Sequence, residues 1–176
     1  MKKQISQVPI TYDISKLKPV ISEKSFNVHY NTIYRIFVDN FNGVEGDIPF
    51  SKAGAHLHGL YFENLRDYRH DNAPVGKSAQ VIEMRYGSYE NFVHSLLDQA
   101  DRLQGNGWLF MNTSGYVNII PNNRIVDNVA MIIDLWEHAF FFNYGNERNK
   151  YVSDTLKLIN WDVVNQRILS PKKETD

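Results

Sequence analysis

The chain contains no cysteine, no excess of charge of either sign and no long apolar run. Without cysteine it can form no disulfide, thiolate nucleophile, iron-sulfur cluster or cysteine-ligated zinc site. Lys and Arg number 19 against 20 for Asp and Glu, so nothing indicates a general nucleic-acid or membrane surface. No stretch approaches the roughly 18 apolar residues of a membrane span, and no apolar segment follows the first lysines, so we expect a cytoplasmic protein. A bound metal would need histidine and carboxylate ligands.

Aromatic residues are abundant, with 10 Tyr, 10 Phe and 3 Trp among 176 residues, and 43% of the chain is hydrophobic. This content is ample for a packed interior. Apolar residues at spacings of three and four predict a helix over 22–42, with Ile36 on its buried stripe, and a second helical pattern covers 51–68. Glycines and a proline interrupt the pattern between them. We therefore expect an antiparallel helical hairpin, forming an N-terminal lobe over 1–73.

The segment DNAPVG, residues 71 to 76, has the composition of a linker, and a C-terminal lobe over 74–176 is expected after it. Two helical stretches follow, and then two short apolar runs flank the turn pair Ser114-Gly115 and predict a hairpin. Residues 129–136 predict a third strand, and the last two stretches, NKYVSDTLKLI and WDVVNQRIL, are again helical by period. The predicted fold class is α+β, with the helical-hairpin lobe followed by helices around a three-stranded antiparallel sheet.

Two histidines of the predicted hairpin can face each other. His29, Ile33 and Phe37 recur at every fourth position, which places the imidazole on the stripe that the first helix buries. His56 and His58 are two residues apart and lie on different faces of the second helix, so at most one points inward, and we favour His58. The eight residues between the helices reach about 26 Å when extended, enough to cover an axial offset and an interaxial gap of about 10 Å each.

A third candidate group follows the last predicted strand. Asp134 closes a run of apolar residues, and His138 comes four residues later, on the turn that we expect after the strand. A buried carboxylate is costly unless it is paired or bound to a metal. Asp134 and His138 could both bind one ion, while a structural hydrogen bond between them would explain the same spacing. The residues alone leave these two interpretations open.

The C-terminal segment resembles a known family. The run NNRIVDNVAMIIDLWEHAFFFNYGNERNKYVSDTLKLINWDVVNQRI is similar to the C-terminal part of the iron/manganese superoxide dismutases, whose hallmark is a D-x-W-E-H-A motif followed by an N-W pair. Trp136 and Asn160-Trp161 match that pattern. Further matches occur in chain order at PITYD, the helical His29, AGAHLHGLYF, IEMRYGSYENF and GNGW. The resemblance covers nearly the whole chain.

The resemblance implies a metal centre with His29, His58, Asp134 and His138 as ligands. Three imidazoles and one carboxylate suit iron or manganese. The family uses one such ion per chain to convert superoxide, its substrate, into oxygen and hydrogen peroxide. No nucleic acid and no membrane is expected as a partner.

Other family positions imply roles around that ion. Glu137 matches a carboxylate that crosses a dimer interface to a metal-ligand histidine of the partner subunit, which predicts a homodimer through Glu137 and His138. Trp108 and Trp136 match residues that line the metal cavity, although both could be ordinary core aromatics. Asn123, or its neighbour Asn122, stands where the family holds a longer amide or imidazole against the metal-bound solvent.

The sequence departs from the family where polar groups usually line the substrate funnel. Phe37, Ile33 and Phe141 occupy positions that usually hold a tyrosine, a histidine and a second tyrosine. Because the whole hydrogen-bonding set is replaced, no buried polar group is left without a partner. Gly54 follows the manganese-type arrangement at the helical site for the solvent-contacting side chain. We therefore expect an unusually apolar funnel and leave the choice between iron and manganese open.

Two further functions compete with the dismutase hypothesis. The fold could have been recruited as a structural or interaction component of a larger assembly, with little or no dismutase activity and a metal retained for stability. Alternatively, zinc could act at the same ligands as a Lewis acid for hydrolysis. All four ligand positions hold a residue of the required type, which favours the redox hypothesis over a structural component. No general base stands out beside the ligands, so zinc hydrolysis is not favoured.

Overall fold

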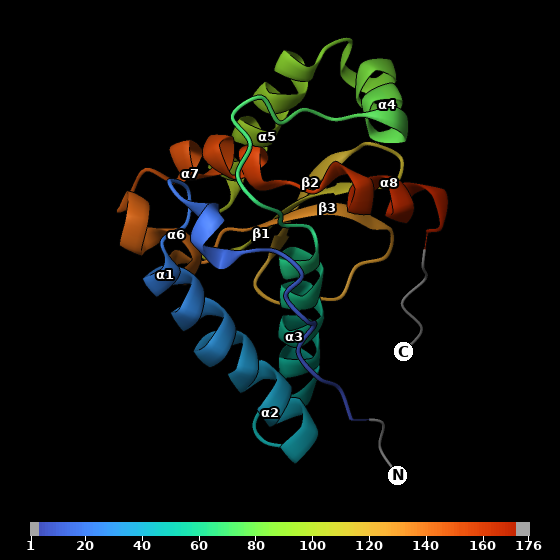
Figure 1. Cartoon of the computed structure of the whole chain (residues 1–176). Helices are drawn as coiled ribbons and strands as arrows, with labels where there is room; N and C mark the ends of the chain where they lie inside the picture. Colours follow the sequence, from blue (N-terminus) through green and yellow to red (C-terminus); the bar gives the residue numbers. More distant parts are fainter. Residues whose placement is uncertain (1–3, 172–176) are drawn as a thin grey trace.

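The structure is a computed structural model and describes residues 4–171. A three-stranded antiparallel sheet in the order β2-β1-β3 lies between a helical hairpin and a second group of helices (Figure 1). The strands are β1 (Gly107–Asn112), β2 (Val117–Pro121) and β3 (Val129–Asp134). The helices are, in chain order, α1 (Glu23–Val28), α2 (Arg35–Gly43), α3 (Ile48–Glu63), α4 (Gly76–Tyr86), α5 (Tyr89–Arg102), α6 (Glu137–Tyr144), α7 (Arg148–Thr155) and α8 (Trp161–Leu169). The α+β class predicted from the sequence is confirmed.

Side-chain caps define the helical hairpin. Ser22 begins α1 by accepting a hydrogen bond from the Ser25 N–H, and Asp47 begins α3 by accepting one from the Phe50 N–H. Helix α3 therefore starts earlier than the predicted 51–68 and ends at Glu63. Asn64 stops it: its amide donates to the Tyr61 carbonyl at 2.8 Å and accepts from the Ile132 N–H of β3 at 2.8 Å. The same side chain thus ends the helix and fastens it to the sheet.

A π-helical turn, His29–Tyr34, joins α1 to α2 and shifts the buried stripe of the first helix. The residues buried after His29 are Tyr34 and Val38, whereas Ile33 and Phe37 are only partly buried. Ile36 is 50% exposed, so its predicted place on the buried stripe is wrong. A π turn holds more residues than an α turn, and each following residue is therefore displaced around the axis.

The sheet is covered on both faces, and β3 is buried along its whole length. One core cluster joins the sheet to α4, α5, α7 and α8, and the other joins it to α1, α2 and α3. Strand β1 pairs with both neighbours, so Trp108 lies opposite Asp134 on one side and Ile120 on the other. The second cluster takes residues from both lobes predicted by sequence, and their division at 73/74 stays a prediction.

The segment after β3 differs from its predicted form. The strand ends at Asp134 rather than at 136, and the turn expected to carry His138 is the first turn of α6. The cause is local: the Asp134 side chain accepts a hydrogen bond from the Trp136 N–H at 2.8 Å, which turns the chain into the helix. His138 therefore has a helical backbone as its support.

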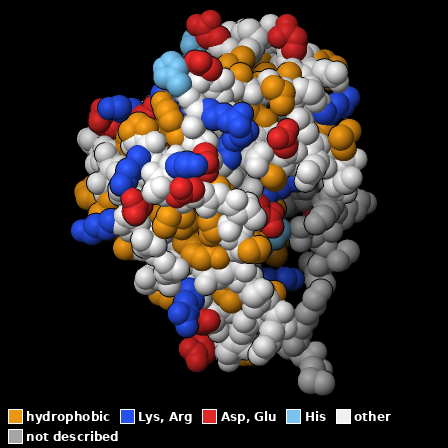
Figure 2. All heavy atoms as spheres, viewed as in Figure 1, with side chains coloured by type: hydrophobic (Ala, Val, Ile, Leu, Met, Phe, Trp, Pro, Cys, Tyr) orange, Lys and Arg blue, Asp and Glu red, His pale blue; other side chains and the backbone are white. Residues whose placement is uncertain are grey.

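Within residues 4–171, no helix combines the length and the apolar character needed to cross a bilayer. On the face seen in Figure 2, acidic and basic side chains alternate, without a broad region of one sign. That distribution agrees with the balanced charge of the sequence.

Candidate metal centre

Four side chains from four separate segments converge at the end of β3. His29 opens the π-helical turn, His58 lies in α3, Asp134 is the last residue of β3, and His138 is in α6. Each offers one ligand atom, and these atoms all lie within 4.8 Å of one another. The structure therefore brings together the four residues that the sequence analysis selected.

The Asp134 carboxylate lies at the centre of the three imidazoles. Its Oδ2 is 3.0 Å from His29 Nε2, 3.1 Å from His138 Nε2 and 3.6 Å from His58 Nε2. The side chains of Asp134 and His58 are fully buried, and that of His138 is 17% exposed. Access to the cluster is therefore from the His138 side.

Hydrogen bonds to the backbone orient two members of the cluster. His58 Nδ1 lies 2.7 Å from the Gly54 carbonyl oxygen, which can only accept, so Nδ1 carries the proton and Nε2 presents its lone pair. The Trp136 N–H occupies Asp134 Oδ1 and leaves Oδ2 directed at the imidazoles. The Nε2 atoms of His29 and His58 are buried and make no hydrogen bond of acceptable geometry to any described residue.

The protonation states also favour a cation. Burial lowers the pKa of His58 to about 3, and burial lowers the pKa of His29 against the opposing attraction of Asp134. Burial alone would raise the pKa of the Asp134 carboxyl, but His138 and His29 outweigh that effect and hold it below its ordinary value. Two neutral imidazoles, whose Nε2 atoms meet no donor in the described part of the chain, and an ionised carboxylate fit a bound metal ion.

Aromatic rings surround the cluster. Trp108 meets the His58 ring edge-on at a centroid distance of 4.9 Å, and Trp136 stacks on His138 at 5.9 Å. Phe37 lies 5.1 Å from His58, and Phe50 contacts both Phe37 and Trp136, at 5.8 and 6.3 Å. The three partly buried rings of Phe37, Phe50 and Trp136 thus form a continuous apolar wall.

Asn123 is tied to the cluster through Trp108. Its Oδ1 accepts a hydrogen bond from the Trp108 indole N–H at 3.0 Å, while its Nδ2 is buried and has no hydrogen-bond partner among the described residues. Gly54 faces Phe37 and carries no side chain. Asn123, rather than residue 54, therefore supplies an amide donor beside the rings that contact the cluster.

Glu137 and Phe141, both named by the sequence analysis, lie outside the cluster, as do two arginines. Glu137 is exposed, and Phe141 on the same helix is 59% exposed. Arg35 pairs with Asp39 at 3.4 Å on the surface. The Arg148 guanidinium donates to the carbonyls of Ala100 and Leu103, both at 2.8 Å, and thereby closes the end of α5.

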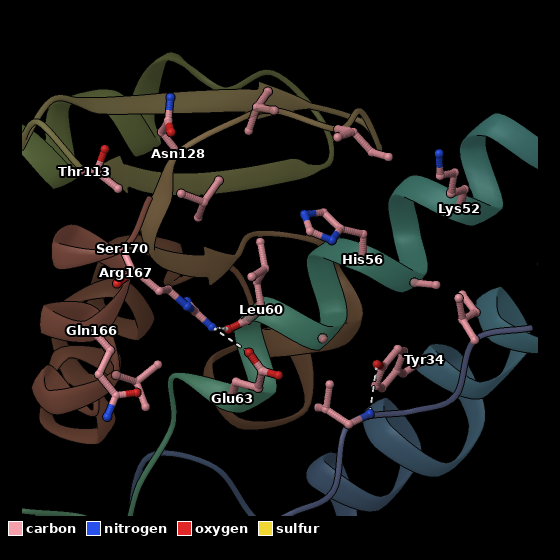
Figure 3. A pocket seen from close by; sticks show the side chains of 18 of the residues that line it. Tyr34, Lys52, His56, Leu60, Glu63, Thr113, Asn128, Gln166, Arg167 and Ser170 are labelled. Atoms are coloured by element: carbon pink, nitrogen blue, oxygen red, sulfur yellow. Dashed lines mark hydrogen bonds and ion pairs between the residues drawn. The ribbon is translucent and has the colours of Figure 1, made fainter. Parts of the chain in front are cut away.

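His56 points away from the cluster, into a pocket of about 600 Å³ behind α3. Figure 3 shows that pocket, with Lys52 and His56 on α3 and the Arg167–Glu63 ion pair across from them. None of the four clustered residues lines it. Of the two histidines two residues apart, His58 is thus the one that faces the cluster.

Residues 74–167 match the model of the family "Iron/manganese superoxide dismutases, C-terminal domain". The chain belongs to the iron/manganese superoxide dismutases. It is 29% identical to "Superoxide dismutase [Fe]" of Saccharolobus solfataricus, over 94% of each chain. It is also 29% identical to "Superoxide dismutase [Mn/Fe]" of Porphyromonas gingivalis, over 91% of this chain and 97% of that one. The mitochondrial manganese enzyme of Aspergillus niger is 25% identical, over 94% and 93%.

Family membership agrees with the cluster, because a set of three histidines and one aspartate is suited to the iron or manganese ion for which the family is named. Sequence reasoning missed two residues beside the cluster. Phe50 completes the apolar wall, and Tyr34 stacks on His58 at 5.6 Å. No motif indicates Phe50, and only the phase shift of the π turn turns Tyr34 inward.

Proposed function

We propose that the protein is a superoxide dismutase that holds one iron or manganese ion through His29, His58, Asp134 and His138. The observation that carries the proposal is the convergence of four ligand atoms within 4.8 Å, two of them buried histidine nitrogens that make no hydrogen bond of acceptable geometry within residues 4–171. An ion of this kind would supply reversible one-electron chemistry, taking an electron from one superoxide and giving it to a second. The products are oxygen and, with two protons, hydrogen peroxide.

The chain's own groups would prepare the site for an anionic substrate. The carboxylate of Asp134 offsets only part of a metal's charge, since the His58 and His29 imidazoles are neutral, so a net positive charge remains to attract superoxide. The Gly54 carbonyl fixes the His58 tautomer, and the Trp136 N–H fixes the rotation of Asp134. These two hydrogen bonds would limit how far the ligands move when a bound ion changes its oxidation state.

The wall of Phe37, Phe50 and Trp136 supports an apolar funnel. These rings exclude water on one side of the cluster and offer no hydroxyl or imidazole for a proton relay. Ile33 and Phe141, which stand where relatives usually have polar groups, add none either. We therefore propose that Asn123 Nδ2 and Trp136 Nε1, two buried donors without partners among the described residues, are the fixed donors that the chain offers to solvent at the site, and that bulk water delivers the protons.

We also propose a homodimer formed by the surface around α6. Glu137 is exposed one residue before His138, and Phe141 and Phe142 expose 59% and 56% of their surface on the same helix. Such large apolar side chains grouped on one element are characteristic of an interface. Glu137 would then reach a metal-ligand histidine of the partner subunit. A cytoplasmic location stays a prediction from the sequence.

Elemental analysis combined with a dismutation assay tests the function. We expect iron or manganese at near one ion per chain and dismutation that is lost, with the metal, in His138→Ala. The control His94→Ala, an exposed histidine on α5, should keep both. Metal without dismutation would instead support the structural-component hypothesis. Zinc alone would support hydrolysis, and absence of any metal from loaded protein would overturn the proposal.

A further inference from the structure

Three tyrosines form a continuous series that leads away from the metal cluster. Tyr61 stacks on His29, with ring centroids 5.3 Å apart and planes inclined by 27°. The Tyr61 and Tyr151 hydroxyls share a hydrogen bond of 3.1 Å, and the Tyr151 and Tyr144 rings lie 5.5 Å apart. Tyr61 and Tyr151 are completely buried, on α3 and α7. The series therefore crosses the interior from a metal-contacting imidazole to α6.

The outer end of this series has a proton acceptor. Tyr144 is partly buried, and its hydroxyl donates to Asp154 Oδ2 at 3.3 Å. Lys157 binds the other carboxylate oxygen at 2.9 Å and holds the side chain in place. Burial raises the pKa of Tyr144, so the phenol is protonated at neutral pH and cannot lose an electron easily without also losing its proton. Asp154 is positioned to take that proton.

We propose that Tyr61, Tyr151 and Tyr144 form a pathway that carries oxidising equivalents from the metal site to the surface. This inference rests on the proposed function, because the oxidant would be a hydroxyl radical formed when hydrogen peroxide, the product of dismutation, takes one electron from the reduced ion and splits into hydroxyl radical and hydroxide. The pathway protects the site by moving the radical away from the residues that contact the ligands. It adds a second activity, the disposal of oxidant, to the dismutation itself.

The transfer balances as a proton-coupled oxidation. The hydroxyl radical at the site gains one electron and becomes hydroxide. Electrons move inward along the series, from Tyr144 to Tyr151 and from Tyr151 to Tyr61, so that the electron deficit ends at Tyr144. The O–H bond of Tyr144 breaks, its proton passes to Asp154, and a neutral tyrosyl radical remains. Asp154 then releases the proton to solvent, hydroxide takes up a proton to form water, and a surface reductant such as ascorbate restores the phenol.

Two tryptophans are the alternative targets. Trp108 lies 4.9 Å from the His58 ring and Trp136 lies 5.9 Å from the His138 ring, so an oxidant formed at the site also meets them. Oxidation of Trp136 would alter the apolar wall permanently, and oxidation of Trp108 would alter the ring that contacts His58. If the tyrosine series supplies electrons to the oxidant, fewer oxidant molecules react with the two tryptophans. Interrupting the series should therefore increase tryptophan oxidation.

Protein radical mapping tests the pathway. Iron-loaded protein would be treated with hydrogen peroxide and a spin trap, with an alcohol present to remove radicals from bulk solution, and adducts located by peptide mass spectrometry. We expect an adduct at Tyr144 in the unaltered protein and its loss in Tyr151→Phe and Tyr61→Phe, where the ring remains but the oxidisable phenol is gone. Oxidised Trp108 and Trp136 should increase in both variants.

Controls separate conduction from packing and from surface attack. Tyr86→Phe removes a partly buried hydroxyl that bonds the Gly115 carbonyl outside the series and should leave the Tyr144 adduct unchanged. Tyr116, half exposed, reports bulk radicals and should stay unlabelled. Absence of the Tyr144 adduct from unaltered protein, or its persistence in Tyr151→Phe, would overturn the pathway.

Metal content and dismutation are measured on the same samples. If both are normal while the adduct pattern contradicts the pathway, only this inference fails. Protein that takes up neither iron nor manganese would overturn the proposed function and the pathway together, and protein that takes up manganese but no iron would overturn the pathway alone. Thermal unfolding of each variant shows whether a lost adduct reflects a lost fold, and two variants at different positions guard against that outcome.

Discussion

The Phe37 ring lies directly over Gly54. A Cβ atom placed on Gly54 would be 2.5 Å from Phe37 Cδ1 and 2.8 Å from its Cγ and Cε1, distances that carbon atoms do not adopt. Gly54 also supplies the carbonyl that orients His58. The two residues therefore constrain each other: the aromatic ring requires glycine on α3, and the absence of a side chain there leaves Asn123 as the neighbouring amide.

Gly54→Ala should destabilise the protein by about 1–3 kcal/mol, the usual range for overpacking a filled site. Denaturant unfolding of the metal-free protein measures this. Gly43→Ala is the matched control, because its Cβ would meet nothing closer than 3.5 Å, and alanine in a helix gains about 0.5–1 kcal/mol over glycine. Gly54→Ala combined with Phe37→Leu should recover part of the loss. A fully stable single variant would show that Phe37 moves freely.

Phe37→Tyr together with Ile33→His should increase turnover at saturating superoxide, because the pair restores a hydroxyl and an imidazole beside the site. Phe37 lies 5.1 Å from His58, so a phenol there reaches solvent close to the cluster. Pulse radiolysis or stopped-flow measurement of superoxide decay gives the rate. Phe37→Tyr alone should gain less, since its hydroxyl lacks a partner. Equal turnover in all three proteins would mean that proton delivery does not limit the reaction.

Asn123→Leu should lower the free energy of unfolding by about 1–3 kcal/mol, because the buried Trp108 indole N–H loses its acceptor. A double-mutant cycle with Trp108→Phe isolates the hydrogen bond from the change in packing. In the Trp108→Phe background we expect Asn123→Leu to cost about 1 kcal/mol less. Equal costs in both backgrounds would show that Asn123 does not contribute through the indole.

Much of the fold follows from local patterns. Apolar periodicity and turn residues located the hairpin, the three strands and α8, whose predicted run WDVVNQRIL coincides with Trp161–Leu169. Periodicity failed where the backbone departs from the α form. The π turn at His29–Tyr34 moves Tyr34 inward and Ile36 outward, and the spacing of apolar residues does not predict this turn.

The residues of the site were easier to select than their surroundings. Helical spacing allowed only one of His56 and His58 to point inward, and the spacing of Asp134 and His138 left two interpretations open. The family resemblance implied the set of four ligands. The contacts of Phe50 with Phe37 and Trp136, and of Tyr61 with Tyr151, join segments far apart in the chain. Such contacts depend on tertiary packing, which a single sequence does not encode in any local pattern.

Alkaline pH should destabilise the fold partly through Tyr89. Burial raises the pKa of Tyr89 to about 12, against about 10 in an unfolded chain. Between these values the folded state keeps a proton that the unfolded state has lost, so the free energy of unfolding decreases as pH rises through this window. The contribution of Tyr89 to the free energy of unfolding is fully present below about pH 10 and is lost as the pH rises toward the pKa of the folded state.

Tyr89→Phe should flatten that decrease. Urea unfolding of metal-free protein across the same pH window measures it, and Tyr116→Phe, at a half-exposed position, serves as the control. If the free energy of unfolding falls equally steeply with pH in Tyr89→Phe and in the unaltered protein, Tyr89 is not a cause of the decrease.

Phe141→Glu should convert the proposed dimer into monomers. Phe141 exposes 59% of its surface on the helix that carries Glu137 and His138, and a carboxylate there would be buried without a partner in an apolar interface. Sedimentation at several protein concentrations gives the mass. Met84→Glu, at a 78% exposed apolar position on α4, is the matched control and should leave the mass unchanged.

The same pair of variants tests whether the interface supports the metal. If Glu137 reaches a ligand histidine across the interface, Phe141→Glu should weaken metal retention as well as association, because that imidazole loses a partner that holds its orientation. Metal content after dialysis against a chelator measures this. If Phe141→Glu is monomeric but retains as much metal as Met84→Glu does, association and metal binding are independent. The proposed dimer would then stand, and Glu137 would have no role at the metal site.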